Sequence, residues 1–384
     1  MSKIITRQAD LEKFCAGLKK ESFITVDTEF IRDSSYWSKL CLIQVAAGSR
    51  ESAVAAIDPL SGNIDLAPFY DLLLDKKILK VMHGSRQDIE IFYHDTGKMP
   101  QSVFDTQIAG MVCGFGDQIG YEKLVKTILG KDIDKSSRFT DWSKRPLNDR
   151  QLDYALSDVT FLRDIYKKIA AMIEKSGRDA WIEEEVSVLL SPRTYDMDPK
   201  NAWKRLKVRT HKKDVIARLQ VLAAWREEIA QKQNRPRNRI LRDDVLQNLA
   251  LHKIETREDF DKTRRFPRDL PEKALMNLLE RLKKAKTPAE MPEKQKQRGL
   301  TEQAAAIIEL LRVLLKYVCE EENIAPKLLA SAQDLEDIAL SDKADVPALK
   351  GWRYDVFGKK ALALKHGEYA VAIKGGKIKF FPLP

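Results

Sequence analysis

Two acidic residues at the end of an apolar stretch are the first candidates for chemistry. Asp27 and Glu29 follow the apolar and β-branched residues 23–26 and are separated by Thr28. On a strand, residues two apart point to the same face, so both carboxylates would lie together. Two like charges repel each other unless a cation lies between them, and a divalent metal is the usual cation. The alternative is a strand end at the surface, where both acids face water.

Three further side chains occur in contexts that could bring them to the same place. Asp88 lies in the first turns of an expected helix that follows an apolar strand. Tyr154 and Asp158 are four residues apart, so they share one face of a long helix expected from residue 148 onward. Apolar neighbours predict that this helix is substantially buried, which argues against a pair that merely faces solvent. These neighbours are Leu152, Ala155, Leu156 and Leu162.

The four carboxylates and the phenol form a chemically sensible set. Hard oxygen ligands bind Mg²⁺ or Mn²⁺, and two such ions about 4 Å apart can activate a water and stabilise the leaving oxygen of a phosphodiester. A tyrosine hydroxyl can orient the attacking water. Each short motif is common by chance. Their order, spacing and expected elements together predict a site for phosphodiester hydrolysis.

The elements that must position these residues have the order of an α/β domain. The strands come first as a meander and then alternate with helices, which predicts a mixed sheet flanked by helices. Strands are expected at 23–30, 40–47, 52–58, 78–83 and 102–105, and helices at 4–20, 65–75, 86–95, 105–113, 121–129 and from 148 past 173.

From residue 213 onward the pattern is nearly all helical, because apolar residues recur at helical spacing. A spacer rich in proline and lysine, at roughly 286–299, divides this part in two, and the tail from Gly367 alternates like a hairpin. We therefore expect an α/β domain at 1–190, a basic linker at 191–212, a first all-α domain at 213–290 and a second at 300–384.

Composition and charge restrict the function further. Hydrophobic content of 43% and charged content of 32% describe an ordinary soluble protein, with no apolar signal segment and no membrane span. The four scattered cysteines predict reduced thiols in a cytoplasmic protein. The net charge is +10, and residues 201–300 hold 27 lysines and arginines against 14 acidic residues. This excess of positive charge suggests a polyanionic partner. In the alternative, the lysines and arginines only make exposed helix faces soluble.

The motifs resemble those of a known enzyme family. Asp27-Thr28-Glu29, Asp88 and Tyr154-x-x-x-Asp158 are similar to the three exonuclease motifs of the DEDDy 3′→5′ exonuclease superfamily, whose fold is ribonuclease H-like. The helical domains resemble HRDC (helicase and RNase D C-terminal) domains, the second one degenerate. More narrowly, five stretches of the chain resemble bacterial ribonuclease D, namely residues 26–30, 40–44, 83–88, 104–106 and 142–147. The resemblance covers essentially the whole chain, with no departure at the five catalytic positions.

This resemblance implies a role for each catalytic residue. Asp27 would bridge two divalent metal ions, Mg²⁺ or Mn²⁺. Glu29 and Asp158 would complete the site of the ion that binds the nucleophilic water, Asp88 would hold the other ion, and Tyr154 would orient the nucleophile. The implied activity is a 3′→5′ exoribonuclease that releases 5′-mononucleotides, with precursor tRNA 3′ ends and other small RNAs as substrates. No obligate protein partner is evident, and we expect a cytoplasmic monomer.

Several residues near the acids are candidates for contacts with RNA. His83 could touch the substrate, although a buried, hydrogen-bonded histidine is the commoner case. The loop before the long helix carries Arg138, Trp142, Lys144 and Arg145. A base-stacking tryptophan beside phosphate-binding cations would suit a single-stranded 3′ end. In the alternative, Trp142 is the hydrophobic anchor of that loop.

The first helical domain and the segment before it hold further basic residues that could contact phosphates. They would position RNA without reading its sequence and would make binding sensitive to salt. In the alternative, any one of them only lies on a solvent-exposed helix face. Tyr36 and Trp37 are weaker candidates for base contacts. The basic set is Lys204, Arg205, Lys207, Arg209, Lys212, Lys213, Arg235, Arg237 and Arg239.

Two other functions stay open at this point. The first is an exonuclease of the same chemistry that acts on DNA, although no polymerase domain follows here. The second is a non-catalytic RNA-binding scaffold or chaperone, which would suit the basic helical half. The complete acid set argues against a scaffold, since acids that face a phosphate backbone would weaken binding.

Overall fold

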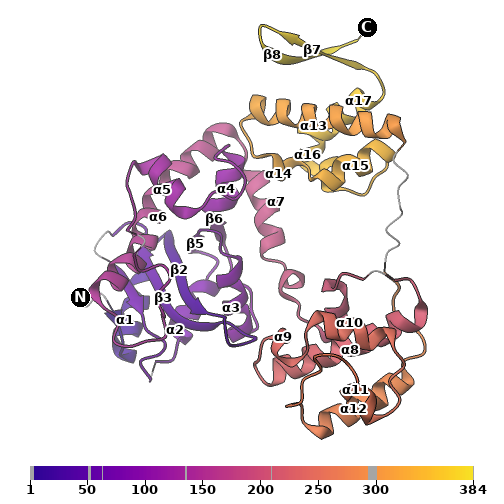
Figure 1. Ribbon diagram of the computed structural model, residues 1–384. Helices are drawn as coiled ribbons and strands as arrows, with labels where there is room; N and C mark the ends of the chain where they lie inside the picture. Colours follow the sequence, from indigo (N-terminus) through magenta and orange to yellow (C-terminus); the bar gives the residue numbers. More distant parts are fainter. Residues whose placement is uncertain are drawn as a thin grey trace.

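The computed structural model describes residues 4–50, 53–62, 64–134, 136–208, 210–292 and 301–383. The N-terminal unit is built on a six-stranded sheet in the order β1-β4-β3-β2-β5-β6 (Figure 1). The β2–β3 and β3–β4 pairs are antiparallel and the others parallel, so the sheet is mixed, as predicted. The strands are β1 Ile4–Ile5, β2 Phe23–Ile31, β3 Lys39–Ala47, β4 Val54–Ile57, β5 Leu79–Met82 and β6 Val103–Asp105.

Helices flank this sheet and bury its apolar residues, which confirms the predicted α/β class (Figure 1). The longest, α6, begins with a capping box between Asn148 and Gln151 and packs against β2 and β3. The helices are α1 Gln8–Leu18, α2 Ala67–Leu74, α3 Arg86–Thr96, α4 Thr106–Val112, α5 Tyr121–Leu129, α6 Asp149–Ser176 and α7 Asp179–Leu189.

The prediction that a helix begins at residue 4 is wrong. Ile4 and Ile5 form β1, which pairs in parallel with β4, and the helix begins only after the extended residue Arg7. Two adjacent isoleucines favour a strand, because a β-branched side chain packs well on a pleated sheet. Arg7 is the residue that precedes the first turn of this helix.

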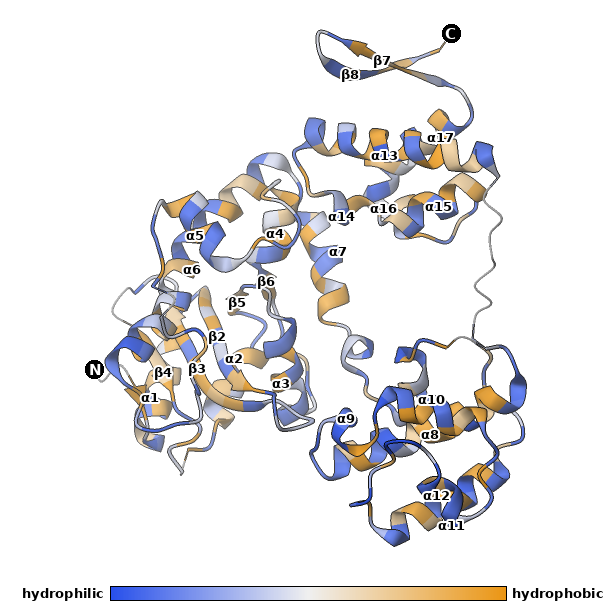
Figure 2. Ribbon diagram, in the orientation of Figure 1, coloured by the Kyte–Doolittle hydropathy of each residue, from blue (hydrophilic) through white to orange (hydrophobic). Residues whose placement is uncertain are grey.

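The first helical unit surrounds the buried side chain of Trp225 on α8. Figure 2 shows hydrophobic and hydrophilic residues alternating along α8 and α12, as expected for helices with one buried face. The helices are α8 Lys213–Lys232, α9 Arg237–Ile240, α10 Asp243–Leu251, α11 Arg257–Asp261 and α12 Glu272–Lys284.

The segment expected as a basic linker at 191–212 is partly wrong. It forms two 3₁₀ helices, Pro192–Tyr195 and Pro199–Arg205, and the second packs against α8. Ala202, Trp203 and Leu206 are buried in the core of the first helical unit. The structural boundary of that unit therefore lies before residue 202.

The second helical unit opens with the long helix α13 and ends in the predicted hairpin. A 3₁₀ turn at Pro347–Leu349 and a π-helical turn at Tyr354–Gly358 interrupt its shorter helices. The other elements are α13 Glu302–Glu322, α14 Pro326–Leu329, α15 Ala332–Leu340, α16 Gly351–Arg353, α17 Lys359–Lys365, β7 Tyr369–Lys374 and β8 Lys377–Pro382. Residues 293–299, half of the spacer expected near 286–299, lie outside the described residues. Among the helices that are described, none is both long and apolar enough to cross a membrane.

The second helical unit docks on the N-terminal unit through Arg353. Its buried guanidinium donates to a Glu184 carboxylate oxygen at 2.7 Å, to Glu185, and to the Leu328 carbonyl at 2.8 Å. Beside it the rings of Trp181 and Trp352 stack with centroids 4.1 Å apart. This contact places the second unit against α7.

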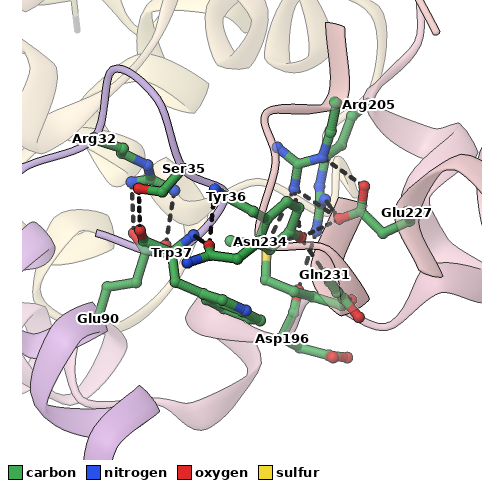
Figure 3. A network of polar contacts seen from close by, with 12 residues as sticks. Arg32, Ser35, Tyr36, Trp37, Glu90, Asp196, Arg205, Glu227, Gln231 and Asn234 are labelled. Carbon is green, nitrogen blue, oxygen red and sulfur yellow. Dashed lines mark hydrogen bonds and ion pairs between the residues drawn. The ribbon is translucent and has the colours of Figure 1, made fainter. Parts of the chain in front are cut away.

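The first helical unit docks on the loop between β2 and β3 (Figure 3). The Tyr36 hydroxyl donates to the fully buried Glu227 carboxylate, which also pairs with Arg205 at 2.9 Å and with Arg237. Asn234 Oδ1 accepts from the backbone N–H of Tyr36 at 3.1 Å. Burial alone would raise the pKa of Glu227, but hydrogen bonds from Arg237 and Tyr36 lower it. Glu227 therefore stays ionised and joins the two units.

Replacement of Glu227 by glutamine tests this junction. We expect Glu227→Gln to lower the unfolding free energy by about 2–4 kcal/mol, because two guanidinium groups lose their buried counter-charge. Both guanidinium side chains are about one-third exposed (38% and 31%), so the loss is smaller than for a fully buried pair. Urea denaturation measures the change, and amide hydrogen exchange of Tyr36 should accelerate.

The adjacent residue provides a matched control. Glu228 pairs with Arg281 at 2.9 Å on the surface, where both side chains are about 40% exposed. Glu228→Gln should change stability by less than about 1 kcal/mol. Equal effects of the two substitutions would contradict the assignment of Glu227 as the junction.

Candidate active site

The end of β2 carries the first two acids and extends past its neighbour β5. The parallel β2–β5 pairing runs through residues 23–25 of β2, so Asp27 and Glu29 lie beyond it. On the other side β2 stays paired with β3, and a bulge follows between Glu29 and Phe30. The end of β2 is thus held by one neighbour and open on its other side to α3.

A tight turn between β5 and α3 brings Asp88 to this open side. Gly84 has φ of +61°, a conformation that residues with a side chain rarely adopt. The Asp105 carboxylate accepts hydrogen bonds from the backbone N–H groups of Gly84 and Ser85 at 3.1 and 2.8 Å. Asp88 follows in the first turn of α3 and accepts a hydrogen bond from the Thr28 hydroxyl on β2. The turn therefore fixes Asp88 beside the acidic end of β2.

Helix α6 supplies the remaining two residues. The Thr25 hydroxyl on β2 donates to the Val159 carbonyl at 2.8 Å, which attaches α6 to the strand next to Asp158. One turn earlier, Tyr154 lies half-buried, with its ring 6.1 Å from that of Trp142. The shared helical face predicted for Tyr154 and Asp158 does point toward β2.

These side chains border a cavity of about 410 Å³. Asp27, Glu29, Tyr154 and Asp158 all line it. Asp88 is buried beside this cavity and not in its lining. The structure thus places four of the five predicted residues on one cavity and the fifth immediately behind Thr28.

Burial and mutual repulsion make the acids hold their protons tightly. Burial raises the pKa of Asp27 to about 8, with the negative charge of Asp158 adding to the effect. Burial and then the charges of Asp27, Asp158 and Asp88 raise the pKa of Glu29 to about 9. Burial raises the pKa of Asp158 to about 7, against the opposing charge of Arg138. The pKa of Asp88 is also raised well above its ordinary value, by burial and by Asp27.

The chemistry of this donor set fits a divalent cation. The acids provide hard oxygen ligands, and a cation among them would relieve the repulsion that raises their pKa values. Within the described residues, no three acidic, histidine or cysteine side chains already form a group arranged to hold a metal ion. The acids converge on one place without a closed coordination shell.

The two candidates nearest the acids differ in their surroundings. His83 lines the cavity and its Nδ1 lies 3.0 Å from the Thr106 hydroxyl, in agreement with the expected hydrogen-bonded histidine. Burial lowers its pKa, so the ring is neutral at pH 7. Arg138 is exposed and also lines the cavity. Of the loop residues predicted to contact RNA, Arg138 is placed to meet a substrate there.

Two other loop residues have structural roles. Trp142 is only 3% exposed and packs into a core with Cys41, so it is the anchor of the loop and not a base-stacking platform. The Arg145 guanidinium pairs with Asp58 at 2.6 Å and also donates to three backbone carbonyls, which uses all five of its N–H groups. The prediction of a phosphate contact for Arg145 is therefore wrong. Lys144 is exposed and remains a candidate.

Among the basic residues of the first helical unit and the segment before it, some have acidic partners within the chain and others are exposed. Arg205 and Arg237 bind Glu227, and Lys204 pairs with Glu290 at 2.6 Å, so these three have partners within the chain. Arg235 lies 3.6 Å from Asp269, whereas Arg239 is exposed. Arg209 lies outside the described residues. Tyr36 is buried at the junction and Trp37 stacks on His94 at 3.9 Å, which removes both from the candidates for free base-binding surfaces.

Sequence reasoning missed two aromatic residues of the cavity. The Tyr121 hydroxyl donates to the Asp158 carbonyl at 2.6 Å and so supports α6 from α5. Phe139 lines the cavity next to Arg138 and is 91% exposed. The sequence does indicate Phe139, because a phenylalanine is unusual in such a polar loop. No sequence spacing relates Tyr121 to the acids.

Comparisons with known proteins agree with this architecture. A family model described as 3′-5′ exonuclease matches residues 2–174, and the HRDC domain model matches residues 216–282. Ribonuclease D of Bartonella henselae is 44% identical over 384 residues, which cover 98% of this chain and 93% of that protein. Ribonuclease D of Nitrobacter hamburgensis is 45% identical over 378 residues, with 98% of both chains covered.

A solved structure shares the whole arrangement. Escherichia coli RNase D, described as an exoribonuclease involved in structured RNA processing, matches with a TM-score of 0.78 and 27% identity, covering 95% of this chain and 98% of that one. These matches include both the exonuclease unit and the HRDC unit and extend over nearly the whole chain. They confirm the family resemblance that the motifs indicate. The chain belongs to the ribonuclease D family of 3′→5′ exoribonucleases.

Proposed function

We propose that this protein removes nucleotides one at a time from RNA 3′ ends, with Asp27, Glu29, Asp88 and Asp158 as ligands of two divalent metal ions. The observation that carries the proposal is the set of buried carboxylates whose pKa values are raised together at the end of β2. Acids arranged at such a cost in repulsion indicate a site that takes up positive charge. Mg²⁺ or Mn²⁺ suits ligands that are all oxygen.

The bound ions would supply Lewis acidity toward the scissile phosphate, and the residues of this chain would orient the reactants. Burial and the nearby acids raise the pKa of Tyr154, so its hydroxyl keeps its proton at neutral pH and can donate a hydrogen bond. Tyr154 is then suited to orient the attacking water. Arg138, at the mouth of the cavity, would attract the phosphate backbone.

The substrates we propose are the 3′ ends of precursor tRNAs and other small RNAs. The exposed Lys144 and Arg239 are suited to hold the backbone of such an RNA without reading its sequence. Four free cysteines are compatible with a reducing compartment, so we propose that the protein works in the cytoplasm. We also propose that it acts as a monomer.

The two other functions have different signatures. A DNA exonuclease would degrade DNA of the same sequence at a rate equal to or above that of RNA. A scaffold would bind RNA without turnover in any metal. Family membership and the cavity argue against both, and one assay with matched RNA and DNA strands distinguishes them.

Loss of one carboxylate should abolish turnover. We expect Asp27→Asn and Asp158→Asn each to lower kcat by roughly 100-fold or more on a labelled RNA with a 3′ overhang, because metal and substrate lose their alignment. Asp164→Asn is the matched control, since Asp164 is an exposed acid on the same helix. EDTA should stop the wild-type enzyme. Unchanged cleavage by Asp27→Asn, or fragments from internal cuts, would refute the proposed site.

Loss of the Tyr154 hydroxyl should affect the chemical step more than binding. We expect Tyr154→Phe to lower kcat by about 10- to 100-fold with little change in KM, since a positioned hydroxyl acts on the reacting water. Tyr166→Phe, further along α6 and packed against Phe23, provides the control for loss of a hydroxyl. A rise in KM with unchanged kcat would assign Tyr154 to RNA binding instead.

The raised pKa values predict how the metal-free protein responds to pH. Folded Asp27, Glu29 and Asp158 hold protons up to about pH 7–9, whereas the unfolded chain releases them near pH 4. The folded state therefore binds more protons between these values, and its stability falls as pH rises through that range. In EDTA at pH 8, Asp27→Asn should raise Tm by about 2–4 °C for each kcal/mol of repulsion removed.

Calorimetry at two pH values tests this expectation. The stabilisation by Asp27→Asn should shrink toward pH 5, where the wild-type acids are protonated. Addition of Mg²⁺ at pH 8 should raise the Tm of the wild-type protein more than that of the variant. Equal Tm values for both proteins in EDTA at pH 8 would contradict the repulsion inferred here.

A further inference from the structure

We propose that Phe139 is a stacking platform for the base at the RNA 3′ end, and that it makes the enzyme select unpaired ends. This inference rests on the proposed function and adds a specificity-determining residue to the same cavity. Phe139 is a large apolar side chain, yet it is 91% exposed at the cavity that the substrate must enter.

No other large apolar side chain in the described part of the chain is as exposed as Phe139. Ile373 follows at 79% and Val188 at 62%, and both lie away from the cavity. Exposed apolar residues scattered singly are common, so exposure alone has no meaning. The position of Phe139 does, since it shares the cavity lining with Asp27, Glu29 and Tyr154.

The backbone around Phe139 is held in place from both sides. Ser137 is buried, and its carbonyl accepts from the Thr140 N–H at 3.3 Å and from the Thr140 hydroxyl at 2.9 Å. Gln151, in the capping box of α6, donates to the Thr140 hydroxyl at 3.2 Å. Buried Trp142 anchors the loop two residues further on. The ring is thus presented from a fixed turn that is attached to the helix bearing Tyr154 and Asp158.

The charges beside the ring favour a nucleotide over an apolar partner. The Arg138 guanidinium lies 5.2 Å from the Phe139 ring centroid, within the range of a cation–π contact. Its positive charge also opposes the rise in the pKa of Glu29 and Asp158, so it acts on the acid cluster as well as on the ring. An aromatic face, a cation for phosphate and a group of acids in one cavity match the base, backbone and scissile bond of one RNA end.

Stacking on Phe139 would discriminate by pairing and not by sequence. Every base has an aromatic face, so the platform tolerates all four bases. A base in a duplex has its faces covered by its neighbours and must first unstack and unpair to reach the ring. An unpaired 3′ end therefore reaches the cavity without that barrier.

Steady-state kinetics of Phe139→Ala, Phe139→Trp and wild type test the proposal, with Mg²⁺ and the full chain. On an RNA with an unpaired 3′ overhang, Phe139→Ala should raise KM by about 5- to 100-fold with kcat within about 3-fold of wild type, and Phe139→Trp should restore KM. The ratio of kcat/KM for the overhang over a blunt duplex should fall in Phe139→Ala by a similar factor. Val188→Ala, an exposed apolar residue on α7, should change neither quantity.

A spectroscopic signal separates stacking from a merely structural role. In stopped flow, an RNA with 2-aminopurine at its 3′ end should show a fluorescence decrease on binding, before the increase on release. Wild type and Phe139→Trp should show that decrease, and Phe139→Ala should lack it. Phe139→Ala with unchanged KM and an unchanged decrease would overturn this inference while wild-type cleavage stays intact. Absence of wild-type cleavage would instead overturn the proposed function and this inference with it.

Discussion

Repulsion among four carboxylates at one end of β2 is the constraint on which the rest of the structure depends. Burial and like charge raise the pKa values of Asp27, Glu29, Asp88 and Asp158, so the isolated cluster opposes folding at neutral pH. The surrounding structure holds the cluster together with bonds between elements. The Thr25 hydroxyl attaches α6 to β2, the Asp105 carboxylate shapes the turn before α3, and the Thr28 hydroxyl binds Asp88.

The helical units are attached to the same framework at two distant places. The first unit holds the loop after β2 through the buried Glu227, and the opposite end of that loop is tied to α3 by a pair of hydrogen bonds from Arg32 to Glu90. The second unit docks on α7 through Arg353. Both units are therefore held in place relative to the acids, and with them the exposed basic residues that we propose to contact RNA outside the cavity (Figures 1 and 3).

Local sequence patterns are sufficient to predict the α/β class and the two pairs of site residues on β2 and α6. Residues two apart on a strand or four apart on a helix share a face, whatever the rest of the chain does. Long-range partners were beyond such reasoning. Arg145 looked like a phosphate contact, and its partner Asp58 lies 87 positions away. The sequence around Trp142 is equally compatible with base stacking and with anchoring of the loop, and only the burial of the side chain distinguishes the two. Residues 199–206 read as a basic linker because lysines and arginines conceal the apolar Trp203, which packs into the first helical unit.

The proposed activity requires that these four acids together bind divalent cations. Titration of Mn²⁺ into the protein, followed by isothermal calorimetry at pH 8, measures this directly. We predict two bound ions per chain for the wild type, with proton release because the acids must ionise, and at least one of the two ions lost in Asp27→Asn. Mn²⁺ binding that is identical in the wild type and in Asp27→Asn would contradict the account.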